Sequence, residues 1–139
     1  MLEHPASDSI DLLVIAGEAS GDEHAARLLN ELKAKKPDLK VAALGGPRLQ
    51  EAGAELLLDL TKYAVVGIFE VLRNYWFFRK LFHETIGCIQ KFRPQAVLLV
   101  DYPGFNLRLA DALRQRGIST KGGGAVRLLQ YVSPQLWAW

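Results

Sequence analysis

The sequence predicts an α/β fold built on a doubly wound parallel β-sheet. Two pentapeptides, 12–16 and 96–100, are wholly apolar, and a continuous apolar strand is buried on both faces, as in a parallel sheet. Strand patterns alternate with helical patterns along the chain, which implies right-handed βαβ units. A turn of small residues at 17–21 follows the first strand, at the edge where such sheets bind ligands.

Length and composition fit one domain, placed at residues 11–139 after a flexible polar lead-in at 1–10. Half of the 139 residues are hydrophobic, and the formal net charge of +2 gives no sign of a nucleic-acid partner. The single cysteine, Cys88, excludes an intramolecular disulfide and favours a reducing compartment. We see no signal-peptide pattern and no run of roughly 18 apolar residues, so we expect a cytoplasmic or peripheral protein.

The first half of the chain predicts three strands and two helices. Ala26, Leu29 and Leu32 form the apolar stripe of the first helix, which Pro37 ends. Gly53 ends the second, shorter helix. The predicted strands are 12–16, 40–44 and 55–58, and the predicted helices are 22–35 and 48–52.

The second half predicts a long helical region, a strand, a helix and a last strand, which we place at 68–92, 96–100, 106–115 and 128–131. Residues 64–67 lead into the long helix, and Pro94 and Gly117 end the two helices. The Gly-rich residues 121–124 predict a flexible insertion. The chain stops after two tryptophans without a closing helix, so we expect the N-terminal part of a longer protein.

The turn after the first strand has almost no side-chain bulk. A ligand can therefore approach the backbone N–H groups at the start of the next helix, which Asp22 or Ser20 is expected to cap. The glycine spacing is that of neither a dinucleotide fingerprint nor a P-loop, so the turn names no cofactor. A tight turn without a ligand is the alternative. The candidate substrate-binding residues here are Gly17, Glu18, Ala19, Ser20 and Gly21.

Asp101 is the strongest catalytic candidate. It follows five apolar residues, and a low-dielectric neighbourhood makes a carboxylate a better base near neutral pH. The alternative is a carboxylate that only caps the turn after its strand. His24, Asn106 and Ser133 are further binding candidates on the same edge, although His24 fits an exposed helix start equally well. No residues have metal-ligand spacing, so we predict no metal site.

Five blocks of sequence occur in an order that resembles one known family. They are AGEASGD at 16–22, GGPRLQEAG at 45–53, VVGIFEVL at 65–72, VDYPGFNLRLA at 100–110 and YVSPQLWAW at 131–139. Together they resemble the N-terminal domain of the lipid-A-disaccharide synthases, glycosyltransferases with two Rossmann-like domains (GT-B type). The resemblance covers residues 12–139. The segment KGGGAVR at 121–127 is longer than expected for the family.

The resemblance implies an inverting transfer of a diacylated glucosamine. The donor is UDP-2,3-diacylglucosamine, the acceptor is 2,3-diacylglucosamine 1-phosphate (lipid X), and the products are UDP and the β-1,6 lipid A disaccharide. It implies that Asp101 is the general base, that no cofactor is needed, and that most UDP contacts lie in a C-terminal domain absent here. It also implies a peripheral location on the inner membrane, while a homodimer is left open.

A long helix over 68–92 would leave large apolar residues off its buried face. Phe69, Trp76 and Phe77 then lie near Arg73 and Lys80, a combination that suits contact with an anionic lipid surface. Packing under a second domain or in a dimer is the alternative. For the whole chain, the competing hypotheses are a Rossmann nucleotide- or flavin-binding module, a non-catalytic binding domain and another sugar-nucleotide enzyme such as a UDP-sugar epimerase.

Overall fold

The computed structural model describes residues 1–64, 75–100 and 103–131. Within them lies a five-stranded sheet in which every neighbouring pair is parallel, in the order β3-β2-β1-β4-β5. The order reverses between β1 and β4, which creates the switch point of a doubly wound sheet. This confirms the predicted fold class. The strands are β1 (Leu12–Ala16), β2 (Val41–Gly45), β3 (Glu55–Asp59), β4 (Ala96–Val100) and β5 (Arg127–Tyr131).

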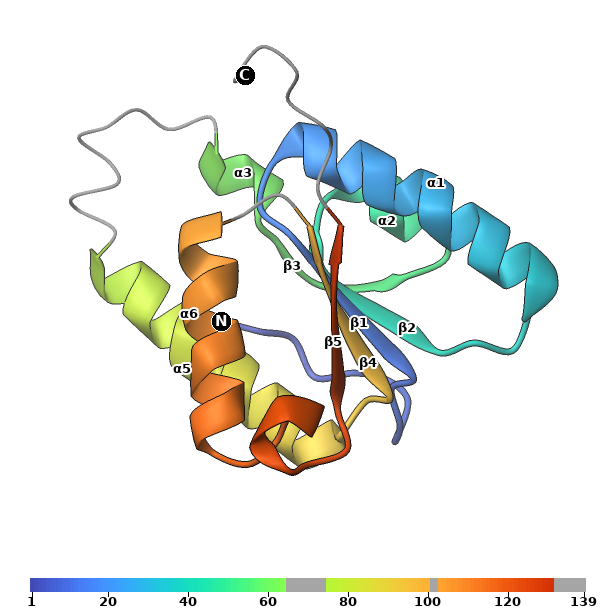
Figure 1. The fold of residues 1–139 in the computed structure, drawn as a ribbon. Helices are drawn as coiled ribbons and strands as arrows, with labels where there is room; N and C mark the ends of the chain where they lie inside the picture. Colours follow the sequence, from blue (N-terminus) through green and yellow to red (C-terminus); the bar gives the residue numbers. More distant parts are fainter. Residues whose placement is uncertain (65–74, 101–102, 132–139) are drawn as a thin grey trace, which may run out of the picture.

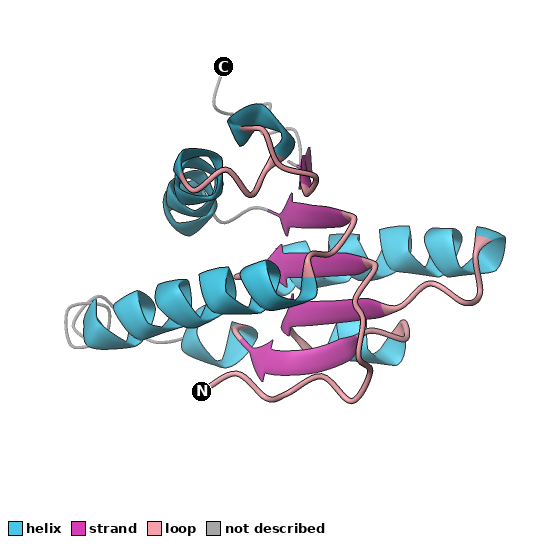
Figure 2. Ribbon diagram, turned by 90° about the horizontal axis from the view of Figure 1, so that it is seen from below, coloured by secondary structure: helices cyan, strands magenta, loops and turns pink. Residues whose placement is uncertain are grey.

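Helices cover both faces of the sheet (Figures 1 and 2). One face carries α1 (Ala19–Lys35) and α2 (Pro47–Glu51), and the other carries α5 (Tyr75–Phe92) and α6 (Pro103–Gln115). The short α3 (Thr61–Ala64), which the sequence did not predict, follows β3. The arrangement is three-layered, with the strand ends and the intervening turns left at the edges.

The core consists of two apolar clusters, one on each face of the sheet. Leu13 and Ile15 of β1 belong to the cluster under α5 and α6, whereas Leu12 and Val14 belong to the cluster under α1 and α2. All five residues of β1 are buried. Alternate side chains therefore serve opposite faces, which is why β1 and β4 are apolar throughout and why their bounds were predicted correctly.

Element ends differ from the predictions where small or turn-forming residues stand. Helix α1 begins at Ala19 rather than at residue 22, because the extended residue is Glu18 (φ −128°, ψ 158°). Helix α6 begins at Pro103 rather than at residue 106, since proline suits the first helical position. Strand β2 is shifted by one residue, α2 begins and ends one residue earlier, and β3 and β5 are each one residue longer.

The long predicted helix is confirmed over its described part, α5, while residues 65–74 lie outside the described residues. Leu81, Ile86 and Ile89 are buried. Phe78 and Phe82 are partly buried against the same cluster. Cys88 also packs there, and desolvation raises the pKa of its thiol while Lys91 lowers it by a smaller amount. Cys88 is therefore a packed thiol.

Two segments expected to be flexible make specific contacts. In the lead-in, the Glu3 N–H donates to the Leu57 carbonyl at 2.9 Å, and the terminal amine pairs with Glu84 at 3.3 Å. In the Gly-rich segment, a Cβ on Gly122 or Gly124 would lie 2.1 Å from a backbone oxygen of Arg114 or Ile118 respectively. The prediction of a flexible insertion is therefore wrong. The segment is a close-packed turn built around a 3₁₀ turn at Thr120–Gly122.

Candidate functional site

The switch point brings the turn after β1 next to the end of β4. Gly17 is buried, whereas Glu18, Ala19 and Ser20 are exposed at the start of α1. Glu18 occupies the N-cap position without a side-chain capping hydrogen bond. The first turn of a 17-residue helix therefore faces this edge with its positive dipole end, where a negative or hydrogen-bond-accepting group is stabilised.

Gly21 has a packing role in this turn. It is buried, and a Cβ built there would lie 3.3 Å from Val100 Cγ1 and 3.7 Å from Ala16 Cβ. Helix α1 therefore approaches the ends of β1 and β4 closely at this residue. Contact with the sheet accounts for the small residue at position 21, so Gly21 is a weaker ligand-contact candidate than the exposed residues before it.

Asp22 does not cap its own helix, which corrects the expectation from the sequence. It lies inside α1, 2% exposed, and its carboxylate accepts three backbone hydrogen bonds from the turn after β2. The donors are the N–H groups of Gly46 at 2.9 Å, Arg48 at 3.0 Å and Leu49 at 3.1 Å. Asp22 is thus the N-terminal cap of α2, supplied from a neighbouring helix.

Asn106 lies in the first turns of α6, directly after β4. It is 4% exposed and shares the buried stripe of Leu109 and Leu113. Within the described part of the chain, its Oδ1 is buried without a hydrogen-bond partner. Because buried acceptors are normally satisfied, this oxygen suits a donor such as a water or a ligand hydroxyl. This buried acceptor supports the predicted binding role of Asn106, which stays a prediction.

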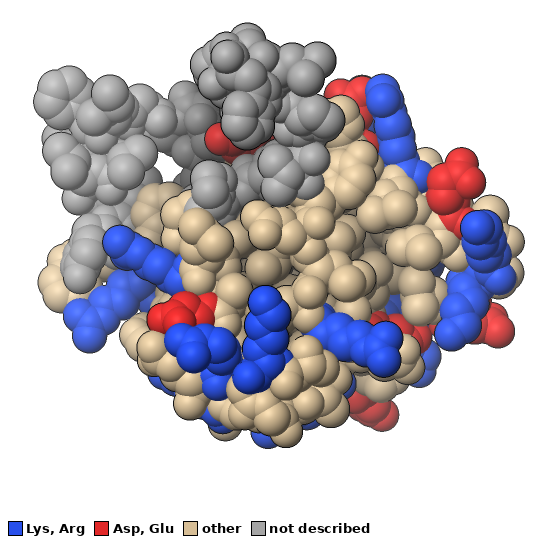
Figure 3. All heavy atoms as spheres, viewed as in Figure 1, with Lys and Arg blue, Asp and Glu red and all other residues tan. Residues whose placement is uncertain are grey.

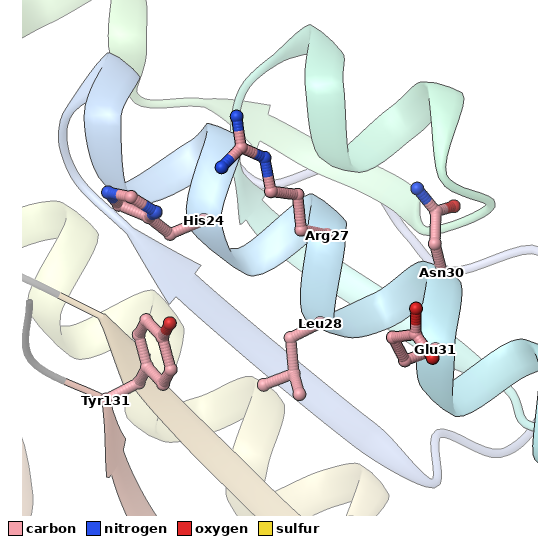
Figure 4. A pocket seen from close by; sticks show the side chains of 6 residues that line it. All are labelled: His24, Arg27, Leu28, Asn30, Glu31 and Tyr131. Atoms are coloured by element: carbon pink, nitrogen blue, oxygen red, sulfur yellow. The ribbon is translucent and has the colours of Figure 1, made fainter.

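His24 lies on α1 and faces Tyr131 at the end of β5, with ring centroids 6.4 Å apart and planes inclined by 45°. A hollow of about 450 Å³ lies between α1 and β5, and Figure 4 shows the two rings at one end of it. Sequence reasoning missed Tyr131, although its place as the last residue of a parallel strand was a usable signal. The other lining residues are Arg27, Leu28, Asn30 and Glu31.

Several predicted residues lie outside the described residues: Asp101, Ser133, Phe69 and Arg73. Of the remaining membrane-contact candidates, Trp76 is 69% exposed with Arg79 5.7 Å from its ring centroid, and Lys80 is exposed. Phe77, by contrast, is partly buried against the core cluster rather than lying off the buried face. It is therefore a poor candidate for lipid contact.

Charged side chains of both signs are mixed on the surface of the described residues. On the face shown in Figure 3, Lys and Arg side chains are spread over several elements with Asp and Glu between them. In residues 1–64, 75–100 and 103–131, no three His, Cys, Asp or Glu side chains are placed to hold a metal ion. None of the helices in these ranges has the length and apolar character needed to span a bilayer.

The parallel sheet, its order reversal and the helix start at the switch point define a Rossmann-like domain of the kind found in the N-terminal half of GT-B enzymes. Residues 12–139 match the sequence model of the lipid-A-disaccharide synthetase family. The chain belongs to this family.

Individual relatives agree with this assignment. The chain is 41% identical over 128 residues to lipid-A-disaccharide synthase 1 of Legionella pneumophila. The aligned residues make up 92% of this chain and 32% of the relative. It is 42% identical over 128 residues to lipid-A-disaccharide synthase of Coxiella burnetii, with the same coverage. A Nitrosococcus oceani relative of that name is 41% identical over 133 residues, 91% of this chain and 30% of the relative. The chain thus spans about a third of the length of the curated relatives it matches.

Proposed function

We propose that the full-length protein is a lipid-A-disaccharide synthase and that this chain supplies its acceptor-side domain. The family match over residues 12–139 carries the proposal. The reaction transfers diacylglucosamine from UDP-2,3-diacylglucosamine to lipid X with inversion. An acceptor hydroxyl oxygen forms a bond to the anomeric carbon, the bond from that carbon to UDP breaks, and UDP leaves with the electron pair.

Asp101 is the proposed general base that takes the proton of the acceptor hydroxyl. Its support is its place directly after Val100, a fully buried residue at the switch-point end of β4. One carboxylate on the acceptor side is sufficient, because inversion places UDP on the opposite face of the sugar. A positioned base of this kind contributes about 10²- to 10⁴-fold to the rate.

The neighbouring described residues have distinct proposed roles. The exposed Glu18–Ser20 backbone at the start of α1 contacts a polar group of the acylated sugars, and the unpartnered Oδ1 of Asn106 accepts from a hydroxyl. His24 contributes from the hollow that it shares with Tyr131. Ser133 is proposed as a further contact on the same edge. No metal or cofactor is required, and UDP is bound mainly by the rest of the full-length chain.

Both substrates are acylated, so we propose that the protein works as a peripheral enzyme on the anionic inner membrane. Trp76 and Lys80 support this, because an exposed amphipathic aromatic beside a cation suits the interface. The proposal includes Phe69 and Arg73 as further contacts.

The test is a two-substrate assay with the full-length protein. We expect UDP release and disaccharide formation only when both acylated sugars are present. UDP release or donor conversion without acceptor would instead favour a UDP-sugar epimerase-like enzyme of the same fold. Donor binding without turnover under any condition would favour a non-catalytic nucleotide-binding module.

A further inference from the structure

We infer that Asp22 is a positioning residue of the acceptor-side site. It acts by joining the turn after β1 to the turn after β2, and the inference rests on the proposed function for its catalytic readout. Asp22 itself is 2% exposed, and both of its carboxylate oxygens accept backbone hydrogen bonds. Because the carboxylate is buried and both oxygens are engaged by backbone, its effect on the reaction is transmitted through the turns it holds.

The first link runs from α1 to α2. Oδ1 accepts from the Gly46 and Leu49 N–H groups and Oδ2 accepts from the Arg48 N–H. A carboxylate is the side chain that suits three converging donors, because it only accepts and has about four lone-pair sites. An asparagine in its place would turn an N–H₂ group toward one of these N–H donors.

The second link runs along α1 to the exposed start of the helix. The backbone N–H of Asp22 donates to the Glu18 carbonyl at 2.9 Å, which closes the first turn of α1. The same residue thus closes the turn that carries Glu18, Ala19 and Ser20 and caps α2 with its side chain. A shift of Asp22 is passed directly to the N-cap residue of α1.

The third link reaches the end of β3. The Leu60 N–H donates to the Gly45 carbonyl at 2.7 Å. A Cβ on Gly46 would lie 2.6 Å from Asp22 Oδ2 and 2.7 Å from Thr61 Cγ2, so only glycine leaves room for the carboxylate at that position. The turns after β1, β2 and β3 therefore meet around one buried side chain, which pre-organises this side of the sheet edge.

The experiment compares Asp22→Asn with Glu23→Gln in the full-length protein. Glu23 is the adjacent carboxylate, but it is exposed, and among the described residues it pairs with Arg27 alone, so its variant controls for the loss of one charge. An asparagine whose oxygen keeps the Gly46 and Leu49 N–H groups loses the hydrogen bond from Arg48, so amide exchange at Arg48 should accelerate about 10- to 100-fold. If Asp22 positions the site, exchange also accelerates at Ala19 and Ser20, and the control changes neither.

The kinetic readout separates positioning from mere stability. For Asp22→Asn we expect KM for the acylated sugars to rise about tenfold per folded molecule, with kcat within about twofold, because the wall that binds substrate is displaced but the reacting groups remain. Unchanged KM and kcat in a destabilised variant would overturn the inference. A loss of kcat at constant KM would also overturn it, since that result indicates a direct chemical role.

A second variant covers the case in which Asp22→Asn does not fold. Gly46→Ala keeps the carboxylate but pushes the turn away from it, and the same rise in KM is expected; wild-type KM would overturn the inference. If the wild-type protein transfers no sugar, the proposed function fails. The amide exchange then decides alone: acceleration confined to residues 46–49 overturns the positioning role, and its spread to Ala19 and Ser20 supports it.

Discussion

At the scale of single residues, Gly21 shows how closely the candidate site is built into the packing. A Cβ there would press on Val100 at 3.3 Å, the residue that precedes Asp101. We expect Gly21→Val to destabilise the protein by about 1–3 kcal/mol, because two further methyl groups enter a filled space. Urea unfolding measures this. Gly21→Ala is the graded control, expected to cost less because alanine favours the helix. A Gly21→Val variant with wild-type stability but no activity would instead support a role of Gly21 in ligand contact.

Asp101 gives the sharpest test of the proposed chemistry. In the full-length protein, Asp101→Asn should lower kcat by at least about 10²-fold, the contribution of a positioned base, while the unfolding midpoint stays close to wild type. Asp111→Asn is the matched control, since the partners of this exposed carboxylate in the part of the chain that the structure describes are neighbouring side chains of the same helix. Near-normal turnover by the Asp101 variant would exclude the assignment.

Residue types in the sequence indicated that the candidate site lies at the edge of the sheet, but they did not indicate which side chains contact one another there. The position of Asp22 after a small-residue turn predicted a cap for α1, yet the carboxylate caps α2 because the two helices lie side by side on one face. That contact joins residues 22 and 46–49, which local sequence patterns do not connect. Tyr131 was missed for the same reason: its ring meets His24 only after β5 is placed two strands from β1.

At the scale of elements, the Gly-rich turn between α6 and β5 is rigidly packed. A Cβ on Gly124 would lie 2.1 Å from the Ile118 carbonyl oxygen, and backbone cannot rotate out of the way. Gly124→Ala should therefore lower stability by about 2 kcal/mol or more. Gly87→Ala is the control, and it is expected to raise stability. A Cβ at Gly87 would meet nothing within 4 Å, and alanine is favoured over glycine in helix α5 by about 1 kcal/mol. Equal thermal midpoints for the two variants would contradict the close packing.

Helix α5 carries the membrane proposal. Trp76→Ser combined with Lys80→Gln should weaken binding of the full-length protein to phosphatidylglycerol vesicles about tenfold, since one cation near an anionic surface contributes about 1 kcal/mol and the indole adds apolar burial. Lys91→Gln, at the far end of α5, controls for charge. Phe77 is left intact because it packs against the core. Vesicle binding that is unaltered in the double variant, in a co-sedimentation assay, would argue against a lipid-facing α5.

The elements whose bounds were predicted best are those whose residues fit only one type of structure. Strands β1 and β4 are apolar throughout because both faces are covered, and their bounds follow from that alone. The starts of α1 and α6 were placed too late because alanine, serine, proline and glycine read equally well as turn or first helical turn. The four-residue α3 is too short to carry a period of its own.

At the scale of the whole molecule, the alternation of strands and helices was sufficient to predict a doubly wound sheet. The handedness of βαβ crossovers then limits where each helix can lie, and the two core clusters follow that division. The hollow between α1 and β5 could not be predicted, because its size depends on the separation of two elements that no local pattern records.

Among the described residues, β5 pairs with a strand on one side only, which bears on how this domain behaves in solution. The strand lies at the end of the sheet order, with Leu129 48% exposed and Tyr131 39% exposed. A terminal strand with exposed apolar side chains is a template for another chain, so residues 1–139 produced alone should form concentration-dependent oligomers and precipitate first by strand addition. Leu129→Lys, a gatekeeping charge on that strand, should keep the species monomeric in sedimentation velocity. The solubility of the isolated domain and its tendency to add a strand from another chain thus both depend on the five residues of β5.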